Sequence, residues 1–263
     1  HVGNRNVNEI TDRENYLKEQ STEIEDTCST FSGTLPAFSL ADVAFAVKER
    51  DILNGVTFDI LKGSRTVLLG ENGCGKTTLL RLISRLEKPT RGVILQNIDD
   101  KFGQKSKQSK KWYKKVGVVY QNPDYQLFMQ TVEKEIKFGA KSDEYADEIA
   151  EKFGIKHLYA RHPQSLSEGQ KRRVSIAAVV ATDPEVLILD EPTVGQDYKG
   201  LCEMVEVLNK LHEEAHNTMI TVTHDKRCAA ALCDKSVWIK NGKTYKTGGK
   251  ELVDEFFIQI GVN

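Results

Sequence analysis

One segment of the sequence, residues 70–78, has residue types and spacing suited to holding phosphate. It reads Gly-Glu-Asn-Gly-Cys-Gly-Lys-Thr-Thr and fits the pattern G-x-x-x-x-G-K-[ST] at every fixed position. Its glycines allow the backbone N–H groups to converge on one anion, and the helix that follows adds the partial positive charge of its N-terminus. We expect Lys76 to reach the β- and γ-phosphates and the Thr77 hydroxyl to bind Mg²⁺. The segment therefore predicts a nucleoside triphosphate site. The loop residues expected at this site are Asn72, Gly73, Cys74, Gly75, Lys76, Thr77 and Thr78.

A second segment, residues 186–191, ends four apolar residues with two carboxylates. At the end of a strand, Asp190 is placed to hold Mg²⁺, usually through water. Glu191 is the candidate general base that polarises the attacking water. The alternative is two ordinary surface acids at a strand end, which the phosphate loop in the same chain makes the weaker interpretation.

Two further polar residues follow expected strands. Gln121 comes directly after residues 116–120, where a glutamine could touch both Mg²⁺ and water, although glutamines often end strands. His224 comes after residues 219–223, where it could orient the water and stabilise developing charge. A satisfied surface histidine is otherwise the more common explanation.

The segment 166–170 reads Leu-Ser-Glu-Gly-Gln and precedes an expected helix. A Ser-x-Gly at a helix start offers a hydroxyl and N–H groups to a phosphate. It also fits a plain N-cap, with Ser167 as the cap and Gln170 at N3 of a capping box. Local physics alone favours the cap.

Hydrophobic periodicity indicates the elements that must position these residues. The expected strands cover residues 38–40, 43–47, 56–60, 65–69, 92–95, 116–120, 186–189, 219–223 and 236–239. The expected helices cover residues 79–86, 131–139, 143–153, 169–181 and 198–211. Strands that alternate with helices around a phosphate loop predict an α/β sheet with the nucleotide at the carboxyl ends of its strands.

Composition narrows the class of protein. The chain has 263 residues, 39% of them hydrophobic, and its formal net charge of −1 argues against a broad nucleic-acid surface. Five cysteines, an odd number without C-x-x-C spacing, favour a reduced compartment. The apolar stretches are too short to span a bilayer, and the polar first thirty residues show no signal peptide.

Two polar regions lie outside this pattern. Residues 1–36 are rich in Asn, Thr, Glu and Asp and are expected to be a tail or linker, with a short helix at most over 12–20. Residues 101–115 hold seven lysines and no acid. They suit either a nucleic-acid or acidic partner or a solvated connection. The short length of the run and the adjoining acids Asp99 and Asp100 favour the connection.

Taken together, these segments resemble the ATP-binding cassette (ABC) ATPase family over roughly residues 38–250. Their order along the chain is that of the family's motifs: the phosphate loop at 70–78, the glutamine Gln121, the signature at 166–170, the Walker B strand at 186–191, the D-loop at 193–197 and the switch histidine His224. By this resemblance Gln121 and residues 166–170 become functional positions.

The resemblance implies an α/β P-loop NTPase fold with three parts: a mixed β core sheet, an antiparallel β subdomain and a small α-helical signature subdomain at about 122–180. The cassette would cover residues 37–250, followed by a C-terminal tail at 251–263. It implies ATP and Mg²⁺ as cofactors and two cassettes that close head to tail around two ATP molecules. Ser167, Gly169 and Gln170 would then act on the partner's nucleotide, and Asp197 would couple the two sites.

The sequence departs from the family pattern at three places, one of which is a helical segment between Gly139 and the signature that looks short. Glu168 stands in the signature where the family usually has glycine, between an intact Ser167 and Gly169. The aromatic residue that usually stacks on adenine would fall near Val47, which is not aromatic, so we expect base stacking to be weak or to use Phe45.

Residues 121–128 and 131–139 also look like the ATPases of energy-coupling factor transporters, which import vitamins or metal ions. In that group this stretch contacts a transmembrane coupling subunit. The resemblance implies an ATPase peripheral to the inner face of the cell membrane, with no nucleic-acid partner. A soluble ABC ATPase of translation or DNA repair is the alternative, but the chain shows neither a coiled-coil insertion nor a second cassette.

Overall fold

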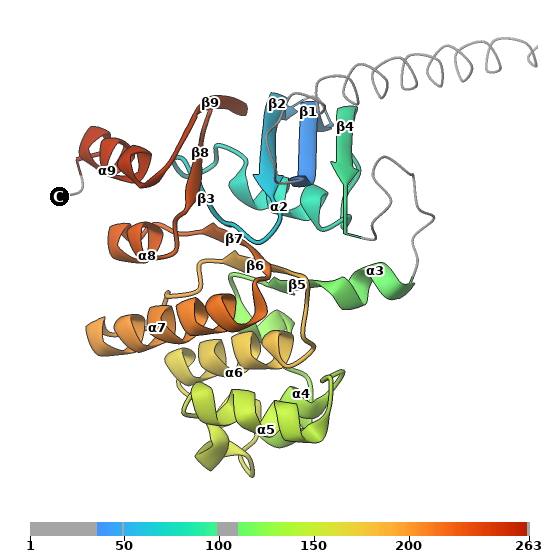
Figure 1. Ribbon diagram of the computed structural model, residues 1–263, viewed down its shortest axis with the longest axis vertical. Helices are drawn as coiled ribbons and strands as arrows, with labels where there is room; N and C mark the ends of the chain where they lie inside the picture. The colour runs from blue at the N-terminus through green and yellow to red at the C-terminus, as the bar shows by residue number, and fades with distance from the viewer. Residues whose placement is uncertain (1–35, 49, 99–109, 262–263) are drawn as a thin grey trace, which may run out of the picture. The chain divides into compact units, whose positions relative to one another are not determined.

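A six-stranded sheet lies at the centre of the computed structural model, which describes residues 36–48, 50–98 and 110–261 (Figure 1). Its strands, in spatial order, are β5 Val116–Val119, β6 Val186–Asp190, β7 Thr218–Val222, β3 Arg65–Leu69, β8 Lys235–Lys240 and β9 Lys243–Gly248. The first five run parallel and β9 is antiparallel to β8. The carboxyl ends of β5, β6, β7 and β3 therefore meet at one edge.

The inner strands of this sheet are buried on both faces. Every residue of β6 and β7 is buried, as continuous apolar runs in parallel sheets require. Successive side chains point to opposite faces, so Ile188 packs with one cluster of core residues while Leu187 and Leu189 pack with the other. This double burial fixes the register that brings the polar residues at the strand ends together.

A second, antiparallel sheet covers part of one face of the core. It has the order β2-β1-β4, with β1 Pro36–Val47, β2 Arg50–Leu61 and β4 Arg91–Gln96. Its inward residues, such as Phe38, Leu40 and Ile60, are buried with α2 (Lys76–Ile83) and one face of the central sheet. The alternation of buried and exposed side chains along β1 and β2 is the pattern that predicts strands at 38–40, 43–47 and 56–60.

A helical subdomain lies between β5 and β6 in the chain. It contains α4 Val132–Lys137, α5 Asp143–Lys152 and α6 Glu168–Val180, with 3₁₀ turns at Pro123–Tyr125, Lys156–Leu158 and Pro163–Ser165. These elements share one hydrophobic cluster with α7 (Tyr198–Ala215) and the second face of the sheet. Figure 1 shows α4 and α5 at the far side of α6 from the sheet.

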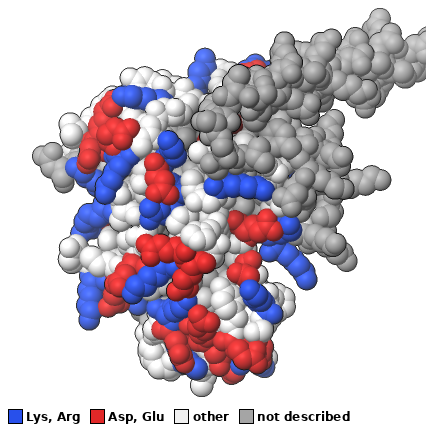
Figure 2. Space-filling view, in the orientation of Figure 1, with Lys and Arg blue, Asp and Glu red and all other residues white. Residues whose placement is uncertain are grey.

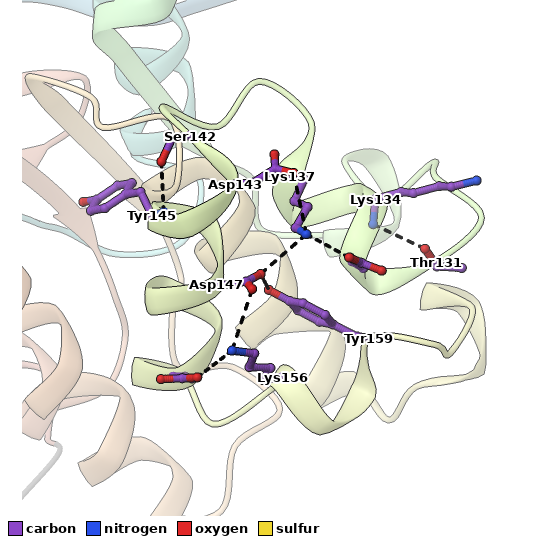
Figure 3. Close-up of polar contacts among 11 residues, drawn as sticks. Thr131, Lys134, Lys137, Ser142, Asp143, Tyr145, Asp147, Lys156 and Tyr159 are labelled. Carbon is purple, nitrogen blue, oxygen red and sulfur yellow. Dashed lines mark hydrogen bonds and ion pairs between the residues drawn. The ribbon is translucent and has the colours of Figure 1, made fainter.

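Polar contacts join the helical subdomain at its surface (Figure 3). The Asp147 carboxylate in α5 accepts a hydrogen bond of 2.8 Å from the Tyr159 hydroxyl and lies 3.7 Å from the ammonium groups of both Lys137 and Lys156. Lys137 also donates to Glu133 in its own helix. Each exposed ion pair contributes little to the free energy of unfolding. The cluster instead helps to orient α4 against α5, because Lys137 of α4 contacts Asp147 of α5.

The fold class expected from the sequence is confirmed, since the chain has the mixed core sheet, the antiparallel sheet and the helices between β5 and β6. Four helices or strands were not expected: α3 (Lys110–Lys115), α8 (Lys226–Ala231), β9 and α9 (Lys250–Gln259). Helix α8 has only six residues. Strand β9 lies at the edge of the sheet, with mostly exposed residues and no alternation of apolar and polar side chains. Neither gives a periodic signal.

The expected C-terminal tail at 251–263 instead contains most of α9, which ends at Gln259. Residues 262–263 lie outside the described residues. The helix buries four side chains against Trp238 of β8: Leu252, Val253, Phe256 and Phe257. Phe256 makes edge-to-face contacts with both Trp238 and Phe257, at centroid distances of 5.1 Å. The prediction of a tail was wrong because four apolar residues within six positions are enough to pack one helix face.

The polar regions at 1–36 and 101–115 are only partly described. Residues 1–35, with the short helix considered at 12–20, and residues 99–109 lie outside the described residues. The end of the lysine run forms α3 (Lys110–Lys115), where Trp112 is buried and its indole N–H donates to Gln96 at 2.8 Å. This end is anchored in the core rather than being a solvated connection.

The surface mixes both signs of charge, with one concentration of acids. Figure 2 shows red side chains gathered over the lower end of the molecule, where Figure 1 places α4 and α5. Helix α5 alone carries Asp143, Glu144, Asp147, Glu148 and Glu151. Of the helices in the described part of the chain, none combines the length and apolar character that a bilayer crossing requires.

The packing of α9 predicts a clear contrast between two variants of that helix. Phe256→Ala should lower the free energy of unfolding by about 3–5 kcal/mol, because it removes a buried aromatic side chain and leaves a cavity. Ile258→Ala, on the exposed face of the same helix, should change it by less than about 0.5 kcal/mol. Urea denaturation of both variants checks this. Equal losses in the two would show that α9 does not pack as described.

Candidate active site

A cavity of about 590 Å³ opens at the edge where the parallel strands end. Its lining unites the phosphate loop with the residues predicted at three other strand ends. Those residues are Gln121 after β5, Asp190 and Glu191 at the end of β6, and His224 after β7. The loop residues in the lining are Asn72, Gly73, Gly75, Lys76, Thr77 and Thr78.

The phosphate loop takes a conformation that requires glycine. Gly75 has φ of 105° and is the N-cap of α2, and a Cβ at that position would lie 2.5 Å from the Leu53 side chain. A Cβ on Gly70 would lie 2.5 Å from the Ile239 carbonyl oxygen. The Lys76 ammonium donates hydrogen bonds to the carbonyls of Gly70 at 2.6 Å and Glu71 at 3.0 Å. The Lys76 ammonium is thus held against the backbone of the phosphate loop, beside the N-terminus of α2.

Two oxygen groups in the cavity suit a hard divalent cation. The Thr77 hydroxyl donates to Asp190 Oδ2 at 3.3 Å and joins the phosphate loop to the end of β6. Burial raises the pKa of Asp190, while the Thr77 hydrogen bond and the Lys76 charge lower it. Hydroxyl, carboxylate and the nearby Gln121 amide are the oxygen ligands that Mg²⁺ takes together with phosphate and water. The residues therefore fit the ion that the sequence implies.

Glu191 lies next to this pair in a constrained backbone conformation. Its φ is +55°, which is uncommon for a residue other than glycine, and its N–H donates to Val222 O at 2.9 Å. The carboxylate is buried, and burial is the main cause that raises its pKa to about 7. Glu191 Oε1 accepts no hydrogen bond from the described residues. A buried carboxylate with a free oxygen and a pKa near neutrality suits a general base.

His224 faces the same carboxylate. Its backbone N–H donates to Glu191 Oε2 at 3.2 Å, and its Nε2 lies 3.5 Å from Oε1. Partial burial, followed by the charge of Lys76, lowers the pKa of His224 below its ordinary value. The imidazole is therefore neutral near pH 7, where its ring N–H can still donate a hydrogen bond.

Arg172 of α6 is a residue of this region that sequence reasoning missed. It is 2% exposed, and its guanidinium donates to Tyr120 O at 2.7 Å and to Gln121 O. Burial lowers its pKa, while Asp190 and Glu191 oppose that effect. A signal was available, because helical spacing puts Arg172 on the same face as the apolar Ile176 and Val180.

The signature residues lie outside the cavity of their own chain. Ser167 and Gln170 form the capping box that local physics favours, with side-chain to backbone distances of 3.3 and 3.1 Å. Gly169 O accepts from the Gln196 amide at 2.8 Å, and Asp197 caps α7 through Gly200 N at 2.7 Å. Neither the signature residues nor Asp197 line the cavity that holds the phosphate loop, although Val194 of the D-loop does.

The unusual signature residue Glu168 has an ionic partner. Its carboxylate lies 3.2 Å from the Lys171 ammonium, which also donates to Asp124 at 2.9 Å. Asp124 lies shortly after Gln121 in the chain. The Lys171–Asp124 contact therefore joins α6 to the same loop that Arg172 contacts. A glutamate at this position is therefore compatible with the start of α6 and adds one exposed link to the glutamine loop.

Two expected positions differ from the structure. Phe45 does not line the cavity, because its side chain packs against the core cluster beneath the antiparallel sheet. The residues of the antiparallel sheet that do line the cavity are Arg50 and Ile52 of β2. Cys74 lines a neighbouring cavity of about 350 Å³, and burial raises the pKa of its thiol.

Comparison with known proteins identifies the family. Residues 53–194 match the family described as ABC transporter. The chain is 40% identical over 221 residues to the energy-coupling factor transporter ATP-binding protein EcfA2 of Enterococcus faecalis, covering 78% of this chain and 74% of that protein. The chain belongs to the ABC transporter ATPase family. The EcfA2 of Bacillus subtilis is also 40% identical, over 210 residues and 76% of each chain.

Solved structures agree with this ABC ATPase assignment. CbiO1 of Clostridium perfringens, described as part of the ABC transporter complex CbiONQ, superposes with a TM-score of 0.73 at 32% identity, over 84% of this chain and 91% of that one. A dimeric ATP-binding cassette bound to ADP and phosphate superposes with a TM-score of 0.71 at 26% identity, over 81% and 98%. The chain is thus an ABC-type ATPase.

The raised pKa of Glu191 predicts how ATP hydrolysis by this ABC ATPase depends on pH. Only the ionised carboxylate accepts a proton, so kcat/KM should fall about tenfold per pH unit below the pKa and level off above it. The midpoint for the free enzyme should lie at about 7. The measurement is steady-state phosphate release with Mg²⁺ in excess, which keeps the nucleotide's own phosphates ionised. A rate that is flat from about pH 5.5 to 8, or that falls as pH rises, would contradict Glu191 as the base.

Proposed function

We propose that this chain is the ATP-hydrolysing subunit that powers an energy-coupling factor importer, with a vitamin or a metal ion as the transported substrate. The observation that carries the proposal is a single cavity that holds a phosphate loop, two buried carboxylates, Gln121 and His224. The 40% identity to EcfA2 proteins supports the importer class.

The roles of the site residues follow from their chemistry. Lys76 and the loop N–H groups bind the β- and γ-phosphates, and Thr77, Asp190 and Gln121 hold Mg²⁺. When bound, Mg²⁺ neutralises charge on the phosphates. Glu191 takes a proton from the attacking water, and His224 orients that water through a ring N–H.

A second cassette is part of the proposal. The signature residues Ser167, Gly169 and Gln170 are separate from the phosphate loop of their own chain, so they are free to serve a partner's nucleotide. Asp197, at the start of α7, stands in the segment that follows Glu191 and is expected to couple the two sites. The similarity to a cassette that forms a dimer with ADP and phosphate supports this arrangement.

The transmembrane coupling subunit is the other proposed partner, and a groove of about 690 Å³ suits it. The groove lies between β5 and the helical subdomain and is lined by Leu127, Phe128 and Phe138, among others. Phe128 and Phe138 are 66% and 57% exposed and contact each other edge to face. Exposed aromatic pairs of this kind mark interaction surfaces.

The floor of this groove is fixed by a buried glutamate. Glu135 is 3% exposed and accepts hydrogen bonds from the backbone N–H groups of Phe128 at 2.9 Å and Met129 at 2.7 Å. Burial raises its pKa. The groove begins a few residues beyond Gln121, so a partner seated in it would act on the glutamine loop of the active site.

The proposal places the chain at the inner face of the cell membrane, bound through its partner and without nucleic acid. The acids gathered over α4 and α5 would repel a phosphate backbone (Figure 2). In this proposal the coupling subunit holds the chain at the bilayer.

Purification of the tagged chain from its native membranes tests the partner assignment. Mass spectrometry should find a membrane coupling subunit and a second cassette. Phe138→Asp should release the membrane subunit, since it buries a charge in the apolar groove. Ile258→Asp, on the exposed face of α9, is the matched control and should leave the complex intact. Ribosomal or repair proteins in place of membrane subunits would favour the soluble ABC class instead.

A further inference from the structure

The chain leaves the central sheet just before Gln121. The ladder between β5 and β6 ends at Val119, so pairing in the sheet does not fix the path of the next two residues. Side chains fix it instead. The Gln126 amide accepts a hydrogen bond from Tyr120 N at 2.9 Å and donates one to Val118 O at 2.7 Å. The position of Gln121 therefore depends on contacts made by residues elsewhere in the chain.

Arg172 of α6 makes two such contacts from the helical subdomain. One terminal nitrogen of its guanidinium donates to Tyr120 O at 2.7 Å, and the other donates to Gln121 O. Two N–H donors on one rigid plane fix both the distance and the orientation of the groups they hold, which a single ammonium does not. The side chain is 2% exposed, so water competes little for these contacts. The backbone of Gln121 is thus clamped to α6.

The clamp lies beside the oxygen groups that suit a divalent cation. Gln121 lines the same cavity as Thr77 and Asp190, and Arg172 is close enough to Asp190 for their two charges to interact. Arg172 Nε is buried and has no hydrogen-bond partner among the described residues. A buried arginine that serves only the fold is expected to have its donors satisfied. These observations favour a role for Arg172 in the active site.

We propose that Arg172 is a positioning residue for the metal ion of the ATPase reaction. It holds the backbone of Gln121 so that the Gln121 amide can reach the Mg²⁺ that Thr77 and Asp190 would bind. Arg172 itself touches neither the ion nor the nucleotide. Residues that orient metal ligands in this way typically cost about 10–100-fold in metal affinity when they are replaced. The inference rests on the proposed role of Gln121 as a metal ligand.

The experiment measures metal binding apart from catalysis. Mn²⁺, as a spectroscopic substitute for Mg²⁺, is titrated into the ATP-saturated Glu191→Gln protein and followed by electron paramagnetic resonance. Arg172→Met in this background should weaken Mn²⁺ binding by about tenfold or more. The affinity for ATP in EDTA, measured by calorimetry, should stay unchanged, because the phosphate loop is intact. That second measurement also shows that the variant is folded.

Two further variants test the clamp itself. Arg172→Lys keeps the charge but loses the planar pair of donors, so it should lose nearly as much Mn²⁺ affinity as Arg172→Met. Gln121→Ala should show a similar loss. The double variant Gln121→Ala, Arg172→Met should lose little more than either single variant, since both changes act through the same ligand.

The matched control removes an arginine from a similar network at the opposite edge of the sheet. Arg65, the first residue of β3, donates to Asp234 and Asn209 at 2.6 Å each. Arg65→Met should leave Mn²⁺ binding unaffected.

Four results would overturn the proposal. They are unchanged Mn²⁺ affinity in Arg172→Met, an equal loss of ATP affinity in EDTA, full retention of Mn²⁺ affinity in Arg172→Lys, and additive losses in the double variant. If Arg172→Met does not fold, the Arg172→Lys result decides. Normal Mn²⁺ binding by Gln121→Ala would instead remove the proposed metal role of Gln121, on which the inference rests. Failure of the wild-type chain to bind ATP would contradict the proposed function as a whole.

Discussion

Two carboxylates buried side by side at the end of β6 are the constraint on which the rest of the site depends. Asp190 and Glu191 are each 5% exposed, and adjacent negative charges in such a place are costly to bury. The surrounding elements offset that cost with Lys76, the Thr77 hydroxyl, the His224 N–H and the buried Arg172. The part of the burial cost that these groups do not offset raises the pKa of Glu191.

This arrangement explains why the sheet must be parallel and buried. The neighbouring strands β7 and β3 supply His224 and the phosphate loop at the same edge, and the Glu191 N–H is held by Val222 of β7. A one-residue slip of β6 would turn Asp190 to the opposite face of the sheet. The continuous apolar runs of β6 and β7 therefore position the chemistry as well as forming the core.

The same constraint links the active site to the surface groove. Arg172 reaches from α6 to the carbonyls of Tyr120 and Gln121, and its charge also faces the two carboxylates. A shift of the helical subdomain would move these groups together, since the hydrogen bonds of Arg172 tie α6 to the glutamine loop. A partner seated in the groove, as proposed, would thus have a physical path to the Glu191 carboxylate.

The sequence predicts those parts of the site that depend on local spacing. The phosphate loop and the carboxylate pair need only their own residues and a strand before them, and the structure places both in one cavity. Contacts across the fold were not predictable in this way. The hydrogen bonds of Arg172 to the glutamine loop, the packing of Phe45 against the core and the docking of α9 on Trp238 each depend on elements distant in the chain. A motif pattern contains no such information.

The most direct test of the account is phosphate release by the Glu191→Gln variant, measured beside ATP binding by the same preparation. Glutamine keeps the shape of the side chain but cannot accept the proton. The account predicts that turnover is lost by about a hundredfold or more while ATP still binds, because general base catalysis contributes about 10²–10⁴-fold. Hydrolysis at close to the wild-type rate would contradict the assignment of Glu191 as the base.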